Sequence, residues 1–414
     1  MGGFCNDGNV MTLGTYTYVD IKRLATLLFI VASLTLRGQN VDGLKWFKGN
    51  THTHSYWSDG DDFPEMIMEW YKTHDYDFIC LSDHNTLAQG EKWKLIPDFP
   101  AHDRRFREYL NKYGEDWVTY DVDSAKRVRV KLKTLQEYAP LFEEKGKFLI
   151  IQSEEITDGF EKKPIHINAI NVKEAILPSG GMSVTEVMQN NLDKVYEQRQ
   201  RTGQAMFAHI NHPNFIWGIS FQDMMKLNGD RFFEVYNGHP MVNNYGDSTR
   251  PGTEQMWDLL LINGVQKRKP LLFGLATDDS HNYLSYGVRN SNPGRGYIMV
   301  HARELTAASI IEAMESGNFY ASTGVELEEV DFQKGYLSIK VKPKAGVTYS
   351  IQFIGADRGK EKASILKIVN GTEAKYKIKN RNAYVRANII SSKYQENPFR
   401  EGDFEKAWVQ PVRK

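Results

Sequence analysis

Histidine and carboxylate residues recur in short clusters between residues 52 and 281, and these residue types are the usual ligands of zinc, manganese and iron. In the first cluster, His52 and His54 are separated by one residue. Side chains alternate along a strand, so both imidazoles would point to one side and could grip one metal ion. Asp59 follows beside Gly60, at a turn from which a carboxylate could reach inward. A His-x-His pair alone is weak evidence for a metal site, so the prediction of a metal site depends on the other clusters.

The other clusters each close, follow or lie within a short apolar run. They are Ser82-Asp83-His84-Asn85, Ser153-Glu154-Glu155, Ile165-His166-Ile167-Asn168, His209-Ile210-Asn211-His212-Pro213 and Asp278-Asp279-Ser280-His281. Paired acids after a buried strand are costly unless they are neutralised, and a metal ion would do so. Four histidines stand outside this pattern, and we interpret them as surface or structural residues: His74, His102, His239 and His301.

The elements that must position these clusters are predicted from the alternation of apolar runs and helical stretches between Leu44 and about Gly324. That alternation favours parallel strands joined by crossover helices. Candidate strands are residues 77–81, 147–152, 166–172, 205–210, 232–236 and 271–276. Because functional side chains gather at the carboxyl ends of such strands, we expect the clusters to converge on one site.

Two further segments differ in texture from this pattern. Residues 91–146 form a charged insertion, and its alternating run 127–133 is typical of a strand with one solvated face. The alternative is that the insertion is a lid that supplies a phosphate-binding cation. After about Glu326, alternating runs at 337–341, 349–353 and 384–389 predict a small antiparallel β-sandwich. We expect it to pack against the preceding domain, with substrate selection as the alternative role.

Composition is that of a globular protein, with 41% hydrophobic and 12% aromatic residues among 414. Lys plus Arg and Asp plus Glu both number 52, and no basic run occurs, so no specific nucleic-acid partner is expected. The two cysteines cannot form a disulfide framework, and we expect Cys80 to be a buried strand thiol. No oligomeric state follows from the sequence.

The N-terminus is typical of an export signal. Lys22 and Arg23 precede the apolar run Leu24 to Leu36, which is too short to span a bilayer comfortably. We expect residues 1–39 to be a signal peptide or leader cleaved near Gln39, with Met11 as an alternative start. The product would be periplasmic or extracellular and would have no membrane span; an uncleaved anchor or a buried helix is the alternative.

The order of the motifs over about residues 46–320 resembles that of the PHP (polymerase and histidinol phosphatase) superfamily: HxH with a downstream SDG, DHN, EE with a following His, HP, and DDxH. The resemblance implies a distorted (β/α)7 barrel over residues 40–325 that holds two or three divalent ions (Zn, Mn or Fe) and cleaves phosphate esters. Residues 316–324 and 407–411 resemble an exported subgroup with a C-terminal β-domain, here residues 326–414, which includes esterases and carbamate hydrolases.

Carried over position by position, the resemblance implies the following ligands. One metal is held by His52, His54, Glu155 and Asp279; a second by Glu155, His166 and His212; a third by Asp59, His84 and His281. Glu155 is preferred because the family motif is Gly-x-Glu, although Ser153 replaces the Gly, and Glu154 is the fallback. His212 precedes Pro213 and is the better match, which leaves His209 as a strand residue or a neighbour of the ligands.

The expected reaction is attack by a metal-activated hydroxide on a phosphomonoester or phosphodiester of small-molecule size. The leaving-group proton would come from metal-bound water or from Asp83, Glu154 or His209. Arg295 is the first candidate for binding phosphate, and an ordinary loop arginine is the alternative. Two other functions stay open, namely hydrolysis of a carboxylic or carbamate ester at the same metal site, and a non-catalytic binding protein on a degenerate barrel.

Overall fold

The computed structural model describes residues 2–3 and 43–414, and Lys45–Lys414 form one compact unit. The predicted signal peptide, residues 1–39, lies outside the described residues except for residues 2–3. Among the residues that the structure describes, no helix is both long enough and apolar enough to cross a bilayer.

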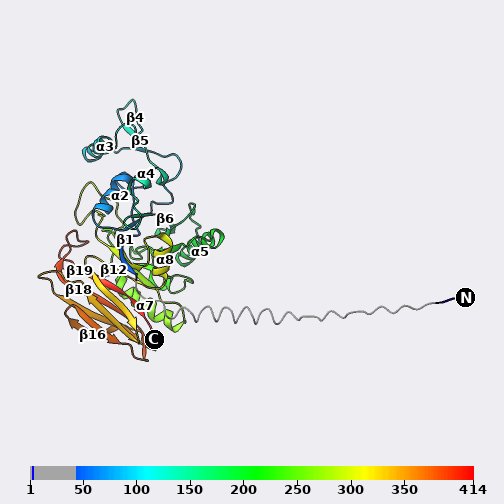
Figure 1. Cartoon of the computed structure of the whole chain (residues 1–414), viewed down its shortest axis with the longest axis vertical. Coiled ribbons are helices and arrows are strands. Elements are labelled where there is room, and N and C mark those ends of the chain that lie inside the picture. Colours follow the sequence, from blue (N-terminus) through cyan, green and yellow to red (C-terminus); the bar gives the residue numbers. More distant parts are fainter. Residues whose placement is uncertain (1, 4–42) are drawn as a thin grey trace. The chain divides into compact units, whose positions relative to one another are not determined.

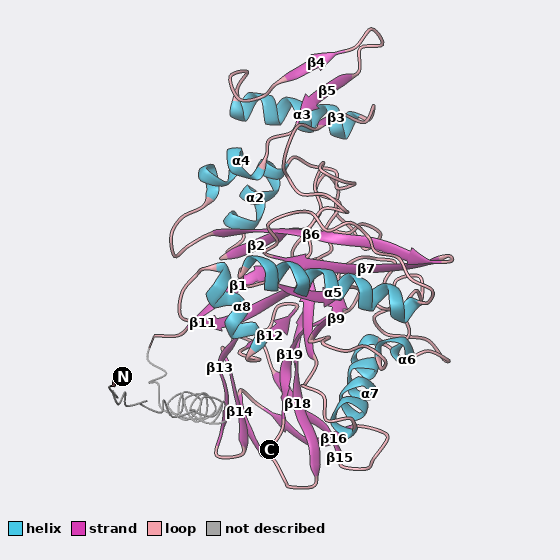
Figure 2. Ribbon diagram, turned by 90° about the vertical axis from the view of Figure 1, so that its right-hand side faces the viewer, coloured by secondary structure: helices cyan, strands magenta, loops and turns pink. Residues whose placement is uncertain are grey.

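One large twisted sheet runs through the compact unit (Figures 1 and 2). Its strand order is β10-β9-β8-β7-β6-β2-β1-β11-β12-β19-β18-β15-β16. The strands in the first part of the chain are β1 (Lys45–Asn50), β2 (Phe78–Leu81), β6 (Leu149–Phe160), β7 (Lys163–Ile170), β8 (Phe207–Ile210), β9 (Phe232–Asn237), β10 (Phe273–Thr277), β11 (Tyr297–Ala302) and β12 (Phe319–Ser322). Strands β2, β8, β9 and β10 are buried along their whole length, which explains their continuous apolar runs.

Strand direction agrees with the prediction only in part. Strands β1, β2 and β6 are parallel to one another, as are β8, β9 and β10. Strand β7 runs antiparallel to both β6 and β8, so the prediction of parallel strands is wrong there. The reason is local: Phe160 pairs with Lys163 across a two-residue turn in which Glu161 has a φ of 57°, and so short a turn can join only antiparallel strands.

Seven helices in the described residues pack around the sheets. They are α2 (Pro64–Thr73), α3 (Pro100–Tyr113), α4 (Leu135–Phe142), α5 (Val184–Thr202), α6 (Phe221–Met224), α7 (Thr253–Gln266) and α8 (Ala307–Glu315). Helix α5 begins at Ser183, whose hydroxyl accepts a hydrogen bond from Glu186 N, and ends at Gly203 in the left-handed conformation. The mixed α/β class is therefore confirmed, whereas the closed barrel of seven strands stays a prediction.

Strand β10 is the last strand in the order of the sheet, and a side chain pairs with its outer edge where a further strand would lie. Gly274 on β10 donates its N–H to Oε1 of Gln410 on β19 at 2.9 Å, and Gln410 Nε2 donates to Gly274 O at 2.8 Å. Both residues are buried. The Gln410 amide thus replaces one step of a β-ladder and holds together two strands that lie far apart in the strand order.

The last part of the chain is antiparallel. Its strands are β13 (Leu327–Gln333), β14 (Tyr336–Val341), β15 (Tyr349–Asp357), β16 (Ser364–Asn370), β17 (Glu373–Lys377), β18 (Asn382–Tyr394) and β19 (Phe404–Val412). Strands β14, β15 and β18 confirm the three predicted runs, and β13-β14-β17 form a second sheet that packs against β15 and β18 through an apolar core. Because β19 pairs with β12, the large sheet continues across the predicted boundary at residue 326, and that boundary stays a prediction.

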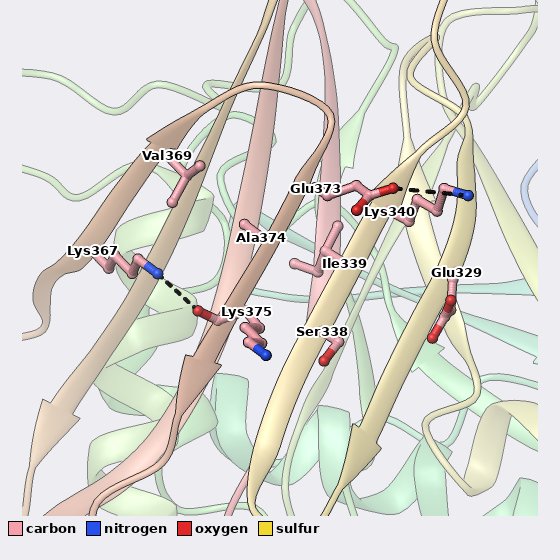
Figure 3. A pocket seen from close by; sticks show the side chains of 9 residues that line it. All are labelled: Glu329, Ser338, Ile339, Lys340, Lys367, Val369, Glu373, Ala374 and Lys375. Carbon is pink, nitrogen blue, oxygen red and sulfur yellow. Dashed lines mark hydrogen bonds and ion pairs between the residues drawn. The ribbon is translucent and has the colours of Figure 1, made fainter.

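A cavity of about 410 Å³ lies between these C-terminal strands (Figure 3). Its walls carry Lys340, Lys367 and Lys375 together with Glu329 and Glu373, and it contains none of the predicted site residues. Lys340 lies 3.9 Å from Glu373, and the Lys367 ammonium donates to the backbone oxygen of Lys375.

The insertion folds as α3 and a small sheet of order β3-β5-β4, in which β3 (Trp93–Leu95) precedes α3 in the chain and β4 (Tyr120–Val122) and β5 (Val128–Lys131) follow it (Figure 2). Val130 and Leu132 are buried, whereas Arg129 points to solvent and bonds Asp121. The predicted strand with one solvated face is therefore confirmed.

Candidate metal centre

The strand ends bring all nine predicted metal ligands together. His52 and His54 follow β1, His84 follows β2, Glu155 and His166 lie in β6 and β7, His212 follows β8, and Asp279 and His281 follow β10. They form four overlapping groups whose ligand atoms lie within 4.8 Å of one another: His52, His54 and Glu155; His52, His212 and Asp279; His84, Glu155 and His166; and His54, Asp59, His84 and His281. Their binding of metal stays a prediction.

Glu155 occupies the middle of the cluster. Its Oε2 atom lies 3.3 Å from His52 Nε2, 3.2 Å from His54 Nε2 and 2.9 Å from His84 Nδ1. The other oxygen, Oε1, lies 3.0 Å from His166 Nδ1 and 3.3 Å from His212 Nε2. With different imidazoles around each oxygen, this carboxylate is placed to bridge two ions.

Asp59 reaches the cluster from a loop. Its Oδ1 atom lies 3.4 Å from His281 Nε2, 3.5 Å from His84 Nε2 and 3.8 Å from His54 Nδ1. The loop can approach so closely because Gly60 has no side chain: a Cβ there would lie 2.6 Å from the carbonyl carbon of His54. The Gly after Asp59 is therefore needed for close approach of the backbone.

Three buried atoms of the cluster have no hydrogen-bond partner among the described residues: His52 Nε2, His54 Nε2 and Glu155 Oε2. The distances between these nitrogens and oxygens are short, but no hydrogen bond joins them. Buried polar atoms without partners are costly, and a cation among them would satisfy all three. The donor set of imidazole nitrogens and carboxylate oxygens without a thiolate suits zinc, manganese or iron, so the residues present fit divalent metal ions.

The cluster is strongly coupled electrically. Burial opposes a charge on His52, but Asp279 and Glu155 outweigh it and raise its pKa well above the usual range. Burial likewise opposes the charge on Glu155, yet the imidazoles of His52, His84 and His166 hold its pKa well below the usual range. A metal ion that binds His52 would therefore have to displace a proton from it.

Glu234 was not predicted, although it contacts the cluster directly. Its Oε1 atom lies 2.7 Å from His52 Nδ1, and its Oε2 accepts from His212 N at 2.8 Å. A carboxylate on the far nitrogen of a ligand imidazole sets its tautomer and aims the other nitrogen at the metal. The available signal was a single acid inside the apolar run Phe232–Tyr236, where an unpaired charge would be costly.

Two of the predicted proton donors lie outside the four groups. Asp83 accepts hydrogen bonds from Ser55 N and Oγ and from Ser58 Oγ, so it holds the loop that follows His54. Glu154 accepts from Ile176 N at 2.6 Å, and burial raises its pKa to about 7. Because neighbouring strand residues point to opposite faces, Glu155 reaches the cluster and the fallback residue Glu154 does not.

The predicted proton donor His209 and the predicted phosphate-binding residue Arg295 are both buried. His209 is fully buried behind His52, with Nδ1 3.8 Å from Glu234 Oε1, and burial lowers its pKa to about 4. Arg295 is 1% exposed and donates to the carbonyls of Gly238, Asn290 and Gly287. These contacts join the loop after β9 to the loop between β10 and β11, so Arg295 positions loops, and its contact with phosphate stays a prediction.

His239, predicted to be a surface or structural residue, lies at the rim of the cluster. Its ring centroid is 5.5 Å from that of His281 and 5.4 Å from that of Phe215. Its Nδ1 accepts a hydrogen bond from Met241 N at 3.2 Å, which leaves Nε2 to carry the proton of the neutral ring. Burial lowers its pKa to about 4, which favours this neutral form.

Comparison with known proteins finds no matching family model and no matching curated protein. Among solved structures, the chain is similar to a two-domain protein from Bacteroides vulgatus that contains a predicted PHP-like metal-dependent phosphoesterase. The two sequences are 15% identical, the match covers 90% of this chain and 97% of that chain, and the TM-score is 0.39. It is also similar to a proposed metal-dependent phosphoesterase from Bifidobacterium adolescentis. Here the sequences are 12% identical, the match covers 56% of this chain and 87% of that chain, and the TM-score is 0.26. Similarity at this level does not assign an activity to the chain.

Proposed function

We propose that the protein is a metal-dependent hydrolase of small phosphate esters that uses two or three divalent ions. The observation that carries this proposal is the convergence of nine imidazole and carboxylate side chains into four overlapping groups, with three buried atoms among them that lack hydrogen-bond partners in the described residues. A binding protein would not need overlapping ligand groups, whereas hydrolysis uses adjacent ions to activate water and to bind the reacting group.

In the proposed assignment, His52, His54, Glu155 and Asp279 hold one ion, and Glu155 also bridges to a second ion held by His166 and His212. Asp59, His84 and His281 hold the third. The group formed by His54, Asp59, His84 and His281 supports the third position, since Asp59 and His281 occur in no other group of the described residues. Ions bound here would supply Lewis acidity, which makes hydroxide available near neutral pH and neutralises charge on phosphoryl oxygens.

The protein's own residues would orient the ligands and donate a hydrogen bond to the substrate. Glu234 keeps the Nδ1 side of His52 occupied, so that Nε2 faces the interior of the cluster. His239 presents its Nε2–H at the rim, where it could donate a hydrogen bond to an oxygen of the substrate, and Asp83, Glu154 and His209 have no such position in the described residues. His239 is therefore our candidate for a neutral hydrogen-bond donor to the substrate.

We also propose export. The basic and apolar leader would direct the enzyme to the periplasm or outside the cell, and cleavage near Gln39 would leave the barrel and the C-terminal domain as the mature protein. N-terminal sequencing of the protein recovered from its native compartment tests this. A mature protein that starts at Met1 or Met11 would contradict it.

The function is tested by purifying the protein without chelators, counting metals by elemental analysis, and assaying p-nitrophenyl phosphate, bis-p-nitrophenyl phosphate and p-nitrophenyl acetate. The matched control is the double variant Asp279→Ala, His281→Ala. Bound metal with turnover of a phosphate ester that is lost in the control supports the proposal. Turnover of the acetate alone would replace it with a carboxylic or carbamate esterase, and a protein that binds no metal would overturn it.

A further inference from the structure

Two lysines of the insertion reach over the loop that carries Asp59. Lys92 and Lys94 lie at β3, and their ammonium groups donate to consecutive backbone carbonyls, those of Trp57 and Ser58, the second at 3.2 Å. The ammonium groups also lie over aromatic rings, 5.6 Å from the Trp57 centroid for Lys92 and 4.9 Å from the Tyr56 centroid for Lys94. The insertion thereby places two positive charges beside the proposed third metal position.

Neither ammonium group has a carboxylate partner within 4.0 Å among the residues that the structure describes. Other lysines nearby in the insertion are paired: Lys131 lies 3.0 Å from Glu91, and Lys133 lies 3.4 Å from Glu137. Lys92 and Lys94 are half-buried and use carbonyl oxygens only. Lys92 and Lys94 thus lack the carboxylate partner that Lys131 and Lys133 have.

Such an arrangement is unfavourable without an anion. Burial and the neighbouring charge of Lys92 lower the pKa of Lys94, while Asp59 and Asp83 act more weakly in the opposite direction. Two ammonium groups held together against carbonyl oxygens repel each other, and an anion between them would remove that cost. Each has donors to spare, because an ammonium group has three and each uses one on a carbonyl.

The position of these charges relative to the cluster follows from Ser58. Its carbonyl binds Lys94, and its hydroxyl lies 3.2 Å from Asp59 Oδ1 and 3.5 Å from His54 Nδ1. One residue therefore separates the Lys94 ammonium from two proposed ligands. A phosphate group at the third metal position would lie within reach of a lysine side chain that turns away from Ser58.

We propose that Lys92 and Lys94 bind the non-bridging oxygens of the substrate's phosphate group and make the enzyme selective for phosphomonoesters. This proposal rests on the proposed function and names its substrate class. A monoester carries two negative charges near neutral pH, which two ammonium groups can balance; a diester carries one, and a carboxylic ester none. The lysines take the role first predicted for Arg295, whose two terminal nitrogens donate to loop carbonyls and to Asn397 Oδ1.

The test compares Lys94→Met, Lys92→Met and the double variant with Lys131→Met, a control on the same small sheet whose lysine is paired with Glu91. Inorganic phosphate is the probe, and its binding to the metal-loaded full-length protein is measured by calorimetry. Each single variant should weaken phosphate binding about tenfold, as expected for one charge-assisted contact. The control should stay within about twofold of the unmodified protein, and metal content should be unchanged in all four.

The second measurement is kcat/KM for p-nitrophenyl phosphate and its bis ester. The lysine variants should lose about tenfold on the monoester and much less on the diester, and Lys94→Arg should restore most of the loss. If Lys94→Met fails to fold, Lys94→Gln keeps a donor for Ser58 O and removes the charge. Equal losses on both esters would indicate a structural role and overturn the proposal.

Failure of the two proposals can be distinguished. If no ester is hydrolysed but the metal-loaded protein binds phosphate through these lysines, the proposed function fails and the phosphate site stands. If esters are hydrolysed while phosphate binding is equal in all the variants, the lysine proposal fails alone. Absence of phosphate binding by the unmodified protein at millimolar concentration would also overturn it.

Discussion

His52 Nδ1 lies 2.7 Å from the Glu234 carboxylate, and both side chains are fully buried. The same carboxylate accepts hydrogen bonds from Thr277 Oγ1, at 2.9 Å, and from Asn237 Nδ2, at 2.8 Å. Burial opposes its charge, but His52 in particular lowers its pKa to about 2. Glu234 is thus a fixed anion that orients a proposed ligand without belonging to any of the four ligand groups.

Replacing this anion should weaken metal binding without abolishing it. In Glu234→Gln the amide cannot accept all the hydrogen bonds that the carboxylate accepts, so His52 loses its fixed orientation. We expect metal affinity to fall about 10- to 100-fold. Competition with a chelator of known affinity measures the change. Glu154→Gln is the matched control, because Glu154 is an equally buried glutamate that lies on the face of β6 opposite to Glu155. The metal affinity of this control variant should be unchanged. An affinity of Glu234→Gln within twofold of the unmodified protein would contradict the orienting role.

Removing Asp59 should affect one metal position only. Asp59 belongs to a single ligand group, with His54, His84 and His281, whereas Glu155 belongs to two. We therefore expect Asp59→Asn to lose about one ion per chain by elemental analysis, because an amide is a poor ligand compared with a carboxylate. Glu155→Gln should lose at least one more. Asp98→Asn, an exposed change in the insertion, controls for surface charge. Loss of all metal in Asp59→Asn, or of none, would show that the third position is assigned wrongly.

The Gln410 amide should contribute to stability and not to chemistry. Gln410→Ala leaves the buried N–H and carbonyl of Gly274 without partners, and each such loss costs about 1–3 kcal/mol. A lower free energy of unfolding, measured by denaturant titration, is expected together with unchanged metal content. Gln333→Ala, at an exposed position of β13, should change the unfolding free energy by less than about 0.5 kcal/mol. Equal stability of the two variants would mean that β10 does not depend on this contact.

Glu154 should make the protein less stable as pH rises. Burial raises its folded-state pKa to about 7 from an ordinary value of 4.5, so the folded state holds the proton more tightly than the unfolded state. Its contribution is fully present below about pH 4.5 and is lost as pH rises through about 7, for a total on the order of 3 kcal/mol. Between pH 4.5 and pH 8, the unfolding free energy of the unmodified protein should therefore fall relative to that of Glu154→Gln. A constant difference would show that Glu154 is not perturbed by burial.

Much of the site could be predicted because its ligand chemistry restricts residue type. His52 and His54 flank Thr53, which forms an isolated bridge just after β1, and both reach Glu155 as the predicted alternation requires. The remaining clusters close, follow or lie within apolar runs, which favour buried strands. The same alternation separates Glu154 from Glu155. The direction of β7 was predicted wrongly because a two-residue turn at Glu161 and Lys162 outweighed the pattern of crossovers that surrounds it.

The sequence by itself determined which residue types could bind metal, the order of their clusters, and the alternation that puts one acid of a pair on each face of a strand. Only the tertiary structure decided which distant atoms meet: Glu234 behind His52, Arg295 among loop carbonyls, His239 at the rim, and Lys92 and Lys94 above Ser58. The physical reason is that periodicity and propensity act over a few residues, whereas these partners are brought together by the packing of strands and loops far apart in the chain.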